Sequence, residues 1–504
     1  DEKSILDSTQ KIFNIVKGNI NKIMSETNTA MDLNKLMELQ VAFLNFTIKC
    51  CPEEERLNSV NNILADCVKL LSKNKNEILS NDTIKLIGKL LAVPLESNMS
   101  IFSMGNFPEL MRYLDYASRA TLSLRIIDSL VSEKATVKLD NSERVSSLMD
   151  FIRPLLEDSP DAGEYDQYQF EYEQASVCKL LFVIQTQDPQ NMYDILNVMK
   201  NTFIKGGLKR EKYTLEALVN AYIILAYKIS YALDKINGNN DMRKEKIHED
   251  FVNYYNLKSL DSNEQIHKFM RRIYSQINDT ISIIENDFSE QALKLYLSVA
   301  IQINDVKVDR NLYEEICYNT LSSAIQIFNR GKLNDDCKVD LINQLVGTVL
   351  NINILSRDNM VAITSNIIQV SQSLLKRSDQ CLAILSCSHL FYKTIVDDAN
   401  KVIDCLNRAK KFADFAMTNP KNAILFIKII NKYLFYLEKC ENDESIDFIN
   451  AETINDLLEL VKNHIQSMKI ENKENEFLPI IEEYYNNTIF MLSQGKKERR
   501  NKVY

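Results

Sequence analysis

The sequence predicts an all-α protein, because it is poor in the two residues that most often interrupt helices. Ten glycines and eight prolines occur among 504 residues, whereas average usage is about 7% and 5%. No proline lies between Pro189 and Pro420. Since proline breaks helix interiors and glycine lowers helix stability, this stretch can form one helix after another. A single core rarely grows beyond about 250–300 residues, so several domains or a repeat array are expected.

Capping residues and a proline mark the first helix pair. Residues 36–46 carry apolar side chains three and four positions apart, with Asp32 as a candidate N-cap and Pro52 beyond the end. Pro52 then begins a second helix, whose first turn carries three glutamates at 53–55, where the helix dipole favours acids. Two helices therefore fit into about forty residues.

The same pairing is expected farther along the chain. Asp188 and Pro189 begin a helix that runs to Phe203 and ends at Gly206 and Gly207. Its partner covers 214–235 before Gly238, and further pairs are expected at 309–328 with 338–354 and at 400–416 with 422–437. A period near forty residues is typical of HEAT-like arrays. We therefore predict a HEAT-like α-solenoid of stacked antiparallel helix pairs that forms an extended rod.

One segment departs from this pattern. Residues 157–173 hold seven acidic side chains and no basic one, together with Pro160 and Gly163. This composition predicts a solvated loop before a helix near Phe170, while its tyrosines at 165, 168 and 172 leave a binding element open. The expected divisions are solenoid pairs at 1–156, the acidic loop at 157–173, further solenoid pairs at 174–495, and a basic, solvated tail at 496–504.

Charge and hydropathy limit the classes of partner. A formal net charge of −9 supplies no overall basic face, so no nucleic-acid partner is expected. No segment reaches the 18 apolar residues of a membrane span, and the chain opens with Asp-Glu-Lys-Ser rather than a signal peptide. A soluble, intracellular protein is predicted. The missing initiator Met suggests a fragment, although maturation or trimming would look the same.

Neither a metal site nor an active site is indicated. The ten cysteines form no C-x-x-C pair and the four histidines, at 248, 267, 389 and 464, lie far apart, so reduced buried thiols and no metal or cofactor are expected. Phosphate-binding loops, a dinucleotide fingerprint, a nucleophile elbow and an H-E-x-x-H pair are all absent from the sequence. We therefore expect no enzymatic activity.

Several stretches occur together in one order: LQVAFLNFTIKCCP at 39–52, FPELMRYLDYASR at 107–119, QDPQNMYDILN at 187–197, KRSDQCLAILSCSHLFY at 376–392 and NKYLFY at 431–436. In this order they resemble the vacuolar protein sorting-associated protein 35 family, the large subunits of retromer. Two positions depart from the family pattern. Tyr392 stands where the family often has tryptophan, and Ser378 stands where a proline is common.

The resemblance implies a non-enzymatic α-solenoid scaffold of the retromer cargo-sorting coat. Such a scaffold works in endosome-to-Golgi and endosome-to-surface retrieval of membrane proteins, as a peripheral protein on the cytosolic face of endosomes. An arrestin-like subunit binds the family's N-terminal end through a P-R-L-Y-L-M motif that this chain lacks. A metallophosphoesterase-like subunit, vacuolar protein sorting-associated protein 29, binds the C-terminal end, here 174–495. The alternative is a helical-repeat transport adaptor that holds extended peptides in a concave groove.

The resemblance also assigns site residues. The family's counterpart of His389, in a helix expected over 380–395, projects into the metal-site pocket of the metallophosphoesterase-like subunit. The other partner-binding candidates are Leu390, Phe391, Tyr392, Tyr433, Phe435 and Tyr436. From the residues alone, an ordinary, partly buried histidine stays open as the alternative. Lys376 and Arg377 are candidates for solenoid self-association, which would form a homodimer through the C-terminal half.

Overall fold

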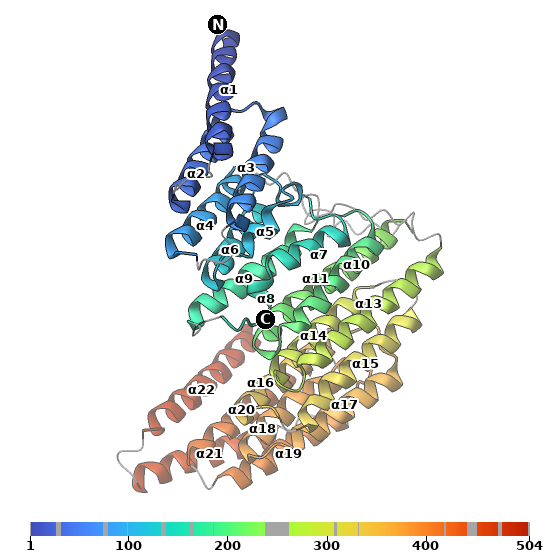
Figure 1. Cartoon of the computed structure of the whole chain (residues 1–504). Helices are drawn as coiled ribbons and strands as arrows, with labels where there is room; N and C mark the ends of the chain where they lie inside the picture. Colours follow the sequence, from blue (N-terminus) through green and yellow to red (C-terminus); the bar gives the residue numbers. More distant parts are fainter. Residues whose placement is uncertain are drawn as a thin grey trace. The chain divides into compact units, whose positions relative to one another are not determined.

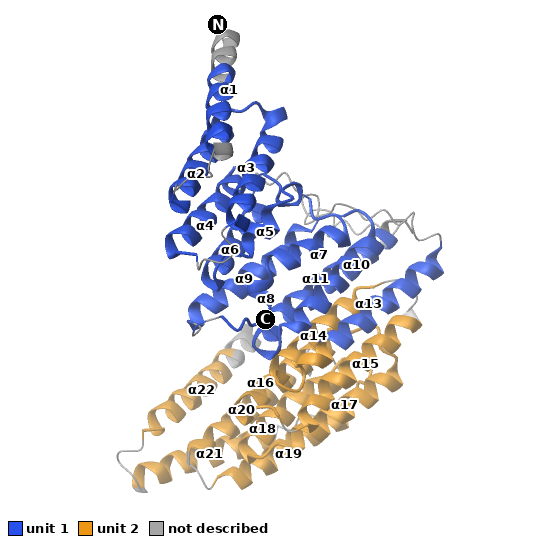
Figure 2. Cartoon of the chain, viewed as in Figure 1, with its two compact units in different colours: residues 1–280 blue, residues 281–504 orange. Residues whose placement is uncertain are grey.

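The structure is a computed structural model, and its described part is helical (Figure 1). It describes residues 2–26, 32–73, 79–97, 99–132, 138–161, 163, 166–184, 186–236, 262–306, 310–330, 332–417, 420–440, 451–471 and 476–501. Within these ranges the one β-type pairing is an isolated bridge between Leu139 and Ile184. The chain divides into two compact units, 1–280 and 281–504, which are described separately (Figure 2).

The first unit stacks helices in sequence order. Its helices are α1 Glu2–Glu26, α2 Leu33–Cys50, α3 Glu53–Lys73, α4 Asn81–Glu96, η1 Ile101–Ser103, α5 Phe107–Met111, α6 Tyr116–Val131, α7 Ser142–Phe151, α8 Arg153–Leu156, α9 Gln167–Val183, α10 Pro189–Lys205, α11 Leu208–Ile236 and most of α13 Asn263–Ile284. α2 packs on α3 and α4, α4 packs on α6, α6 on α9, and α9 on α11. Contacts between helices that lie one to three elements apart in the sequence are typical of a solenoid.

Several helices begin where the sequence predicts. Asp32 precedes α2, and its carboxylate accepts a hydrogen bond from the backbone N–H of Asn34 at 3.2 Å. Asp188 precedes α10 and accepts from the N–H of Gln190 at 3.1 Å. α3 begins directly after Pro52. Because these side chains satisfy N–H groups that lack a partner within the helix, they fix the helix starts, and the predictions are confirmed.

The end of α10 is also where the glycines predict it. α10 ends at Lys205, and Gly207 follows with a φ of 72°, which favours glycine. A Cβ atom at Gly206 would lie 2.5 Å from the carbonyl oxygen of Leu156, at the end of α8. Only a residue without a side chain fits this close backbone approach, so Gly206 fixes how the two segments pack.

The second unit repeats the same architecture. Its helices are α14 Ser289–Asn304, α15 Arg310–Asn329, α16 Asp335–Leu350, α17 Arg357–Gln372, α18 Arg377–Cys387, η3 Ser388–Phe391, α19 Ala399–Ala416, η4 Pro420–Asn422, α20 Ala423–Cys440, α21 Ala451–Glu471 and α22 Leu478–Asn501. α14 packs on α15 and α16, α16 on α18, α18 on α20, and α20 on α22. Contacts between neighbouring helices and between every second helix confirm the predicted solenoid.

Some predicted boundaries are wrong. The helix expected over 338–354 begins earlier, at Asp335, and ends at Leu350, where Asn351 caps it through its own N–H. The partner expected over 214–235 begins earlier, at Leu208. The expected basic tail continues the backbone of α22 as far as Asn501, while residues 502–504 and Gly238 lie outside the described residues. The extended rod stays a prediction. No helix in the described ranges has the length and apolar character needed to cross a membrane.

Candidate partner-binding site

The partner-binding candidates come from two segments of the second unit. His389 and Leu390 lie in η3, Tyr392 follows it, and Tyr433, Phe435 and Tyr436 lie on α20. α18, which precedes η3, packs directly on α20. The fold therefore brings together two sequence stretches that lie about forty residues apart, as the 43-residue separation between His389 and Lys432 illustrates.

The helix expected over 380–395 is wrong in its second half. α18 ends at Cys387, η3 ends at Phe391, and Lys393 has a φ of 52°. A left-handed residue cannot continue a right-handed helix. The backbone N–H of Lys393 donates to the carboxylate of Asp397 at 2.7 Å, and the N–H of Asp398 donates to the carbonyl of Phe391 at 3.0 Å. These bonds hold a tight turn in place of the last helical turn.

A buried hydrogen bond fixes η3 against α20. The hydroxyls of Ser388 and Tyr436 lie 2.8 Å apart, and the Ser388 hydroxyl also lies 2.6 Å from the carbonyl oxygen of Leu385. Ser388 and Tyr436 are both fully buried. Since buried polar groups are costly to leave unpaired, this bond resists sliding between the two segments. The side chain next to Ser388, His389, is thereby held in place.

His389 is surrounded by one cation and two aromatic rings. Its Nε2 atom lies 2.6 Å from Nζ of Lys432, and its Nδ1 atom lies 3.4 Å from the hydroxyl of Tyr436. The imidazole meets the ring of Phe435 edge-on at 5.2 Å between centroids and that of Tyr436 at 5.7 Å. Tyr392 in turn packs on Tyr436 at 5.2 Å. The imidazole is therefore half-buried and well packed.

The surroundings of His389 keep it neutral. Burial, and then the positive charge of Lys432, lower the pKa of His389 from 6.5 to about 4. Burial likewise lowers the pKa of Lys432. Burial acts in the same direction on both groups, because a low-dielectric environment disfavours the charged form of each side chain. At neutral pH the site presents an uncharged imidazole to any partner.

The seven candidates do not share one surface. Leu390, Phe391, Tyr433 and Tyr436 are at most 4% exposed and belong to the core. His389, Tyr392 and Phe435 are half-buried and keep accessible surface. These three side chains together with Lys432 are called the His389 cluster below. Of the four core residues, Tyr436 packs on the rings of His389, Tyr392 and Phe435 and so joins this cluster to the core.

Lys432 is the member of the cluster that sequence reasoning missed. It lies three and four positions before Phe435 and Tyr436 on α20, so all three share one face of the helix. Its ammonium lies 5.9 Å from the centroid of the Phe435 ring, within reach of a cation–π interaction. The spacing of three and four positions between Lys432 and the two aromatic residues could have identified Lys432 from the sequence.

The two self-association candidates lie at the start of α18. Lys376 forms an exposed ion pair with Asp336 at 3.3 Å. The guanidinium of Arg377 lies 5.8 and 5.9 Å from the ring centroids of Phe412 and Phe415 on α19. Phe415 is 70% exposed, and Leu375, next to Lys376, is 81% exposed. Arg377 therefore lies over two aromatic rings, and an exposed leucine precedes Lys376 in the sequence.

Two carboxylates of the acidic segment at 157–173 form ion pairs with arginines of the first unit. Asp158 pairs with Arg210 at 2.8 Å, and Asp161 pairs with Arg119 at 2.8 Å. A hydrogen bond from Ser159, and then Arg119, lower the pKa of Asp161. α9 begins at Gln167, three residues before the expected start, so the solvated loop is shorter than predicted. Tyr165 lies outside the described residues.

The described residues include no group of three or more His, Cys, Asp or Glu side chains that could hold a metal ion. The cysteines that the structure describes are all free thiols. Six of these thiols are buried, at Cys51, Cys67, Cys317, Cys381, Cys387 and Cys405. Burial raises the pKa of Cys387 to about 12, so this thiol stays protonated and unreactive at neutral pH.

Comparison with known proteins places the chain in a family. A family model described as vacuolar protein sorting-associated protein 35 matches residues 1–464. Vacuolar protein sorting-associated protein 35A of Arabidopsis thaliana is 27% identical over 503 residues, which cover 96% of this chain and 58% of that protein. Vacuolar protein sorting-associated protein 35 of Dictyostelium discoideum is 25% identical, covering 90% of this chain and 54% of that protein. The corresponding Schizosaccharomyces pombe protein is 22% identical, with 88% and 49% covered. The chain thus spans about half the length of the curated relatives that it matches. On this evidence the chain belongs to the vacuolar protein sorting-associated protein 35 family.

Proposed function

We propose that this chain is a scaffold part of a retromer large subunit. It holds partner subunits in the coat that retrieves membrane proteins from endosomes to the Golgi and to the cell surface. The observation that carries the proposal is the family match over 1–464, which includes the whole His389 cluster. The helical stacking in each unit supports a scaffold, because a solenoid offers a large surface for its length. The proposal assigns no catalytic step to the chain.

We propose that the His389 cluster binds the metallophosphoesterase-like subunit of retromer. A neutral imidazole suits the rim of a metal pocket, because an imidazolium would be repelled by the metal ions. The lowered pKa of His389 supports this role. Tyr392 and Phe435 flank the imidazole with aromatic surface, the residue type enriched at interface hot spots. The Ser388–Tyr436 bond holds the cluster in one geometry, so little flexibility is lost on binding.

The proposed location is the cytosolic face of endosomes, which the chain reaches through its partners. Binding of the arrestin-like subunit is assigned to a part of the family's chain that carries the P-R-L-Y-L-M motif, which this sequence lacks. We further propose that the surface around Lys376 and Arg377 mediates a homodimer. Leu375, next to Lys376, and Phe415, beside Arg377, support this, since both are large apolar side chains that are exposed. Sedimentation of the wild type and of Phe415→Ser across concentrations tests the dimer.

The scaffold proposal is tested by co-purification. The tagged chain is expressed in cells of its own source and its partners are quantified by mass spectrometry. We expect the metallophosphoesterase-like subunit in near-equal amount as the main partner. Recovery of many unrelated peptides without that subunit would overturn the proposal and favour a general peptide adaptor.

A further inference from the structure

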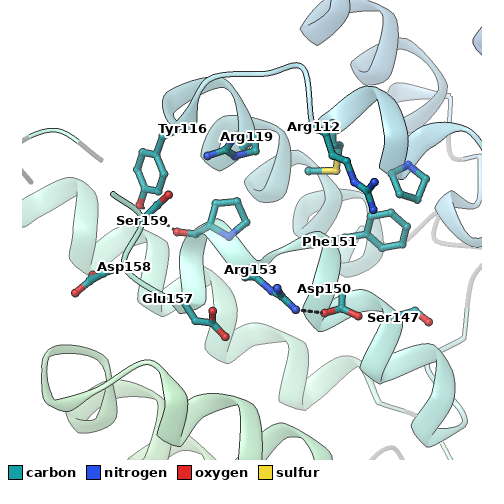
Figure 3. A pocket seen from close by; sticks show the side chains of 13 residues that line it. Arg112, Tyr116, Arg119, Ser147, Asp150, Phe151, Arg153, Glu157, Asp158 and Ser159 are labelled. Carbon is teal, nitrogen blue, oxygen red and sulfur yellow. Dashed lines mark hydrogen bonds and ion pairs between the residues drawn. The ribbon is translucent and has the colours of Figure 1, made fainter. Parts of the chain in front are cut away.

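A cavity of about 790 Å³ lies in the first unit and shares no residue with the His389 cluster. Figure 3 shows it from close by. Its wall is formed by α5, the turn after it, α6, α7, α8 and the start of the acidic segment, so it lies wholly within residues 108–159. A volume of this size falls within the range of ligand sites, about 300–1,000 Å³.

Part of the wall is apolar and packs against the core. Pro108, Met111, Phe151 and Pro154 line the cavity. The ring of Phe151 contacts that of Phe107 edge-on at 5.9 Å between centroids, and Phe107 is fully buried. The hydroxyl of Tyr116, which also lines the cavity, donates to the carbonyl of Pro154 at 3.0 Å. These contacts anchor the wall, so an apolar side chain that enters meets a preformed surface.

Most charges around the cavity are already paired. Arg153 pairs with Asp150 at 2.6 Å, drawn as the dashed line in Figure 3. Arg119 pairs with Asp161, and Asp158 pairs with Arg210. These groups set the shape of the rim, and their charges are balanced within the chain.

Two charges of opposite sign remain unpaired. The side chains of Arg112 and Glu157 line the cavity, and neither forms an ion pair or hydrogen bond with any residue that the structure describes. Figure 3 shows them well separated, with Arg153 between them. Their separation explains why they do not neutralise one another. The cavity therefore offers one free cation, one free anion and apolar surface, counting the described residues alone.

We propose that this cavity binds a short extended segment of a partner protein that carries an acidic, an apolar and a basic side chain. The acidic side chain pairs with Arg112, whose planar guanidinium matches a carboxylate with two parallel hydrogen bonds. The apolar side chain packs on Phe151 and Met111, and the basic side chain pairs with Glu157. Charge complementarity selects this occupant over a purely anionic ligand. Arg112, Arg119 and Arg153 are matched in the lining by Asp150, Glu157 and Asp158, so no net positive field is present.

A peptide array tests the proposal on the full chain. Fluorescent nine-residue peptides carry one Glu, one Leu and one Lys in every order and spacing within a Gly-Ser background. We expect a subset to bind with a Kd below about 100 μM. Arg112→Ala should weaken these peptides about fivefold or more, and Glu157→Gln should weaken them to a similar extent. Arg125→Ala is the matched control, because Arg125 is exposed and pairs with Glu96 outside the cavity.

Charge reversal makes the test specific. Arg112→Glu should lose the original peptides and gain those in which the Glu is replaced by a second Lys. Arg112 is exposed, so its variants should keep the wild-type unfolding temperature. The proposal is overturned if no peptide binds below about 1 mM, or if Arg112→Glu leaves the preference unchanged. Arg112-dependent binding of phosphate or anionic vesicles without peptide binding would also overturn it. Because the cavity and the His389 cluster share no residue, this result is independent of the retromer proposal.

Discussion

The Nε2 atom of His389 lies 2.6 Å from the Nζ atom of Lys432, 43 residues away in the sequence. A lysine ammonium can only donate hydrogen bonds, so Nε2 must accept. The imidazole is then neutral, with its proton on Nδ1, the atom that lies 3.4 Å from the hydroxyl of Tyr436. Lys432 therefore helps to set the protonation state of His389, the residue proposed to bind the partner.

Lowering the pH should destabilise the fold through His389. The pKa of His389 is about 4 in the folded chain and about 6.5 when the residue is unfolded. Between these values the unfolded chain binds the extra proton, so the stabilisation is complete above about pH 6.5 and is lost as the pH falls towards 4. Allowing for the partial exposure of the ring, we expect about 1 kcal/mol to be lost between pH 7 and pH 5. Urea unfolding at both pH values measures the loss of unfolding free energy. This loss should be larger in the wild type than in His389→Gln. Equal losses in the two proteins would contradict the assignment of this pH dependence to His389.

Removing the charge of Lys432 should raise the pKa of His389. Lys432→Met keeps the length of the side chain but removes the cation at Nε2. Because burial is the larger cause of the shift, the pKa should rise and still remain below 6.5. Titration of the imidazole signals by NMR measures the value, with His389→Gln identifying the resonance. A pKa that stays at its wild-type value would show that Lys432 does not control the imidazole.

Replacing Gly206 with alanine should destabilise the first unit. The new Cβ would lie 2.5 Å from the carbonyl oxygen of Leu156, and a backbone atom cannot move aside as a flexible side chain can. Overpacking of this kind commonly costs about 1–3 kcal/mol. Gly88→Ala on α4 serves as the control, since a Cβ at Gly88 would meet no neighbouring atom within 4 Å and alanine favours helices. Chemical denaturation should give a lower free energy of unfolding for Gly206→Ala than for Gly88→Ala. Equal stability of the two variants would contradict the close approach between Gly206 and the carbonyl oxygen of Leu156.

Arg210 should contribute more to stability than its exposed partner. Its side chain is 2% exposed, and it donates to Asp158 at 2.8 Å and to the carbonyl oxygens of Leu155 and Gly206 at 3.2 Å. Arg210→Met removes all three of these hydrogen bonds, while the carbonyl of Leu155 keeps one from the Gln174 amide at 3.0 Å. The loss should cost about 2–3 kcal/mol. Asp158→Asn changes a carboxylate that is 61% exposed and should cost less than about 1 kcal/mol. The reverse order in a denaturation series would contradict this account.

The helix starts and the end of α10 could be predicted because local chemistry decides them. Asp32 and Asp188 cap their helices through side-chain hydrogen bonds to residues two positions ahead, and Gly207 supplies the left-handed backbone. Such signals lie within a few residues of the boundary. The helix-pair arrangement follows from them, because short connections place consecutive helices side by side.

The features that were missed depend on tertiary contacts. α18 ends at Cys387 with no glycine or proline nearby, and the left-handed residue of the turn is Lys393, held by a hydrogen bond to Asp397. Lys432 reaches His389 only because α20 packs on α18. The acidic segment likewise gave no sign in the sequence that Arg119 and Arg210 would neutralise two of its carboxylates. Composition alone could not distinguish a solvated loop from one paired with distant cations.

The most direct test of the scaffold account is calorimetric titration of this chain with the metallophosphoesterase-like subunit. Phe490→Ala, an exposed aromatic change on α22, is the control and should bind like the wild type. His389→Ala should weaken binding at least tenfold, because truncating an anchor at an interface commonly costs about 2 kcal/mol or more. Its unfolding temperature should fall by no more than about 4 °C, since the ring is only half-buried. Wild-type affinity in His389→Ala, or no binding by the wild-type chain, would contradict the account.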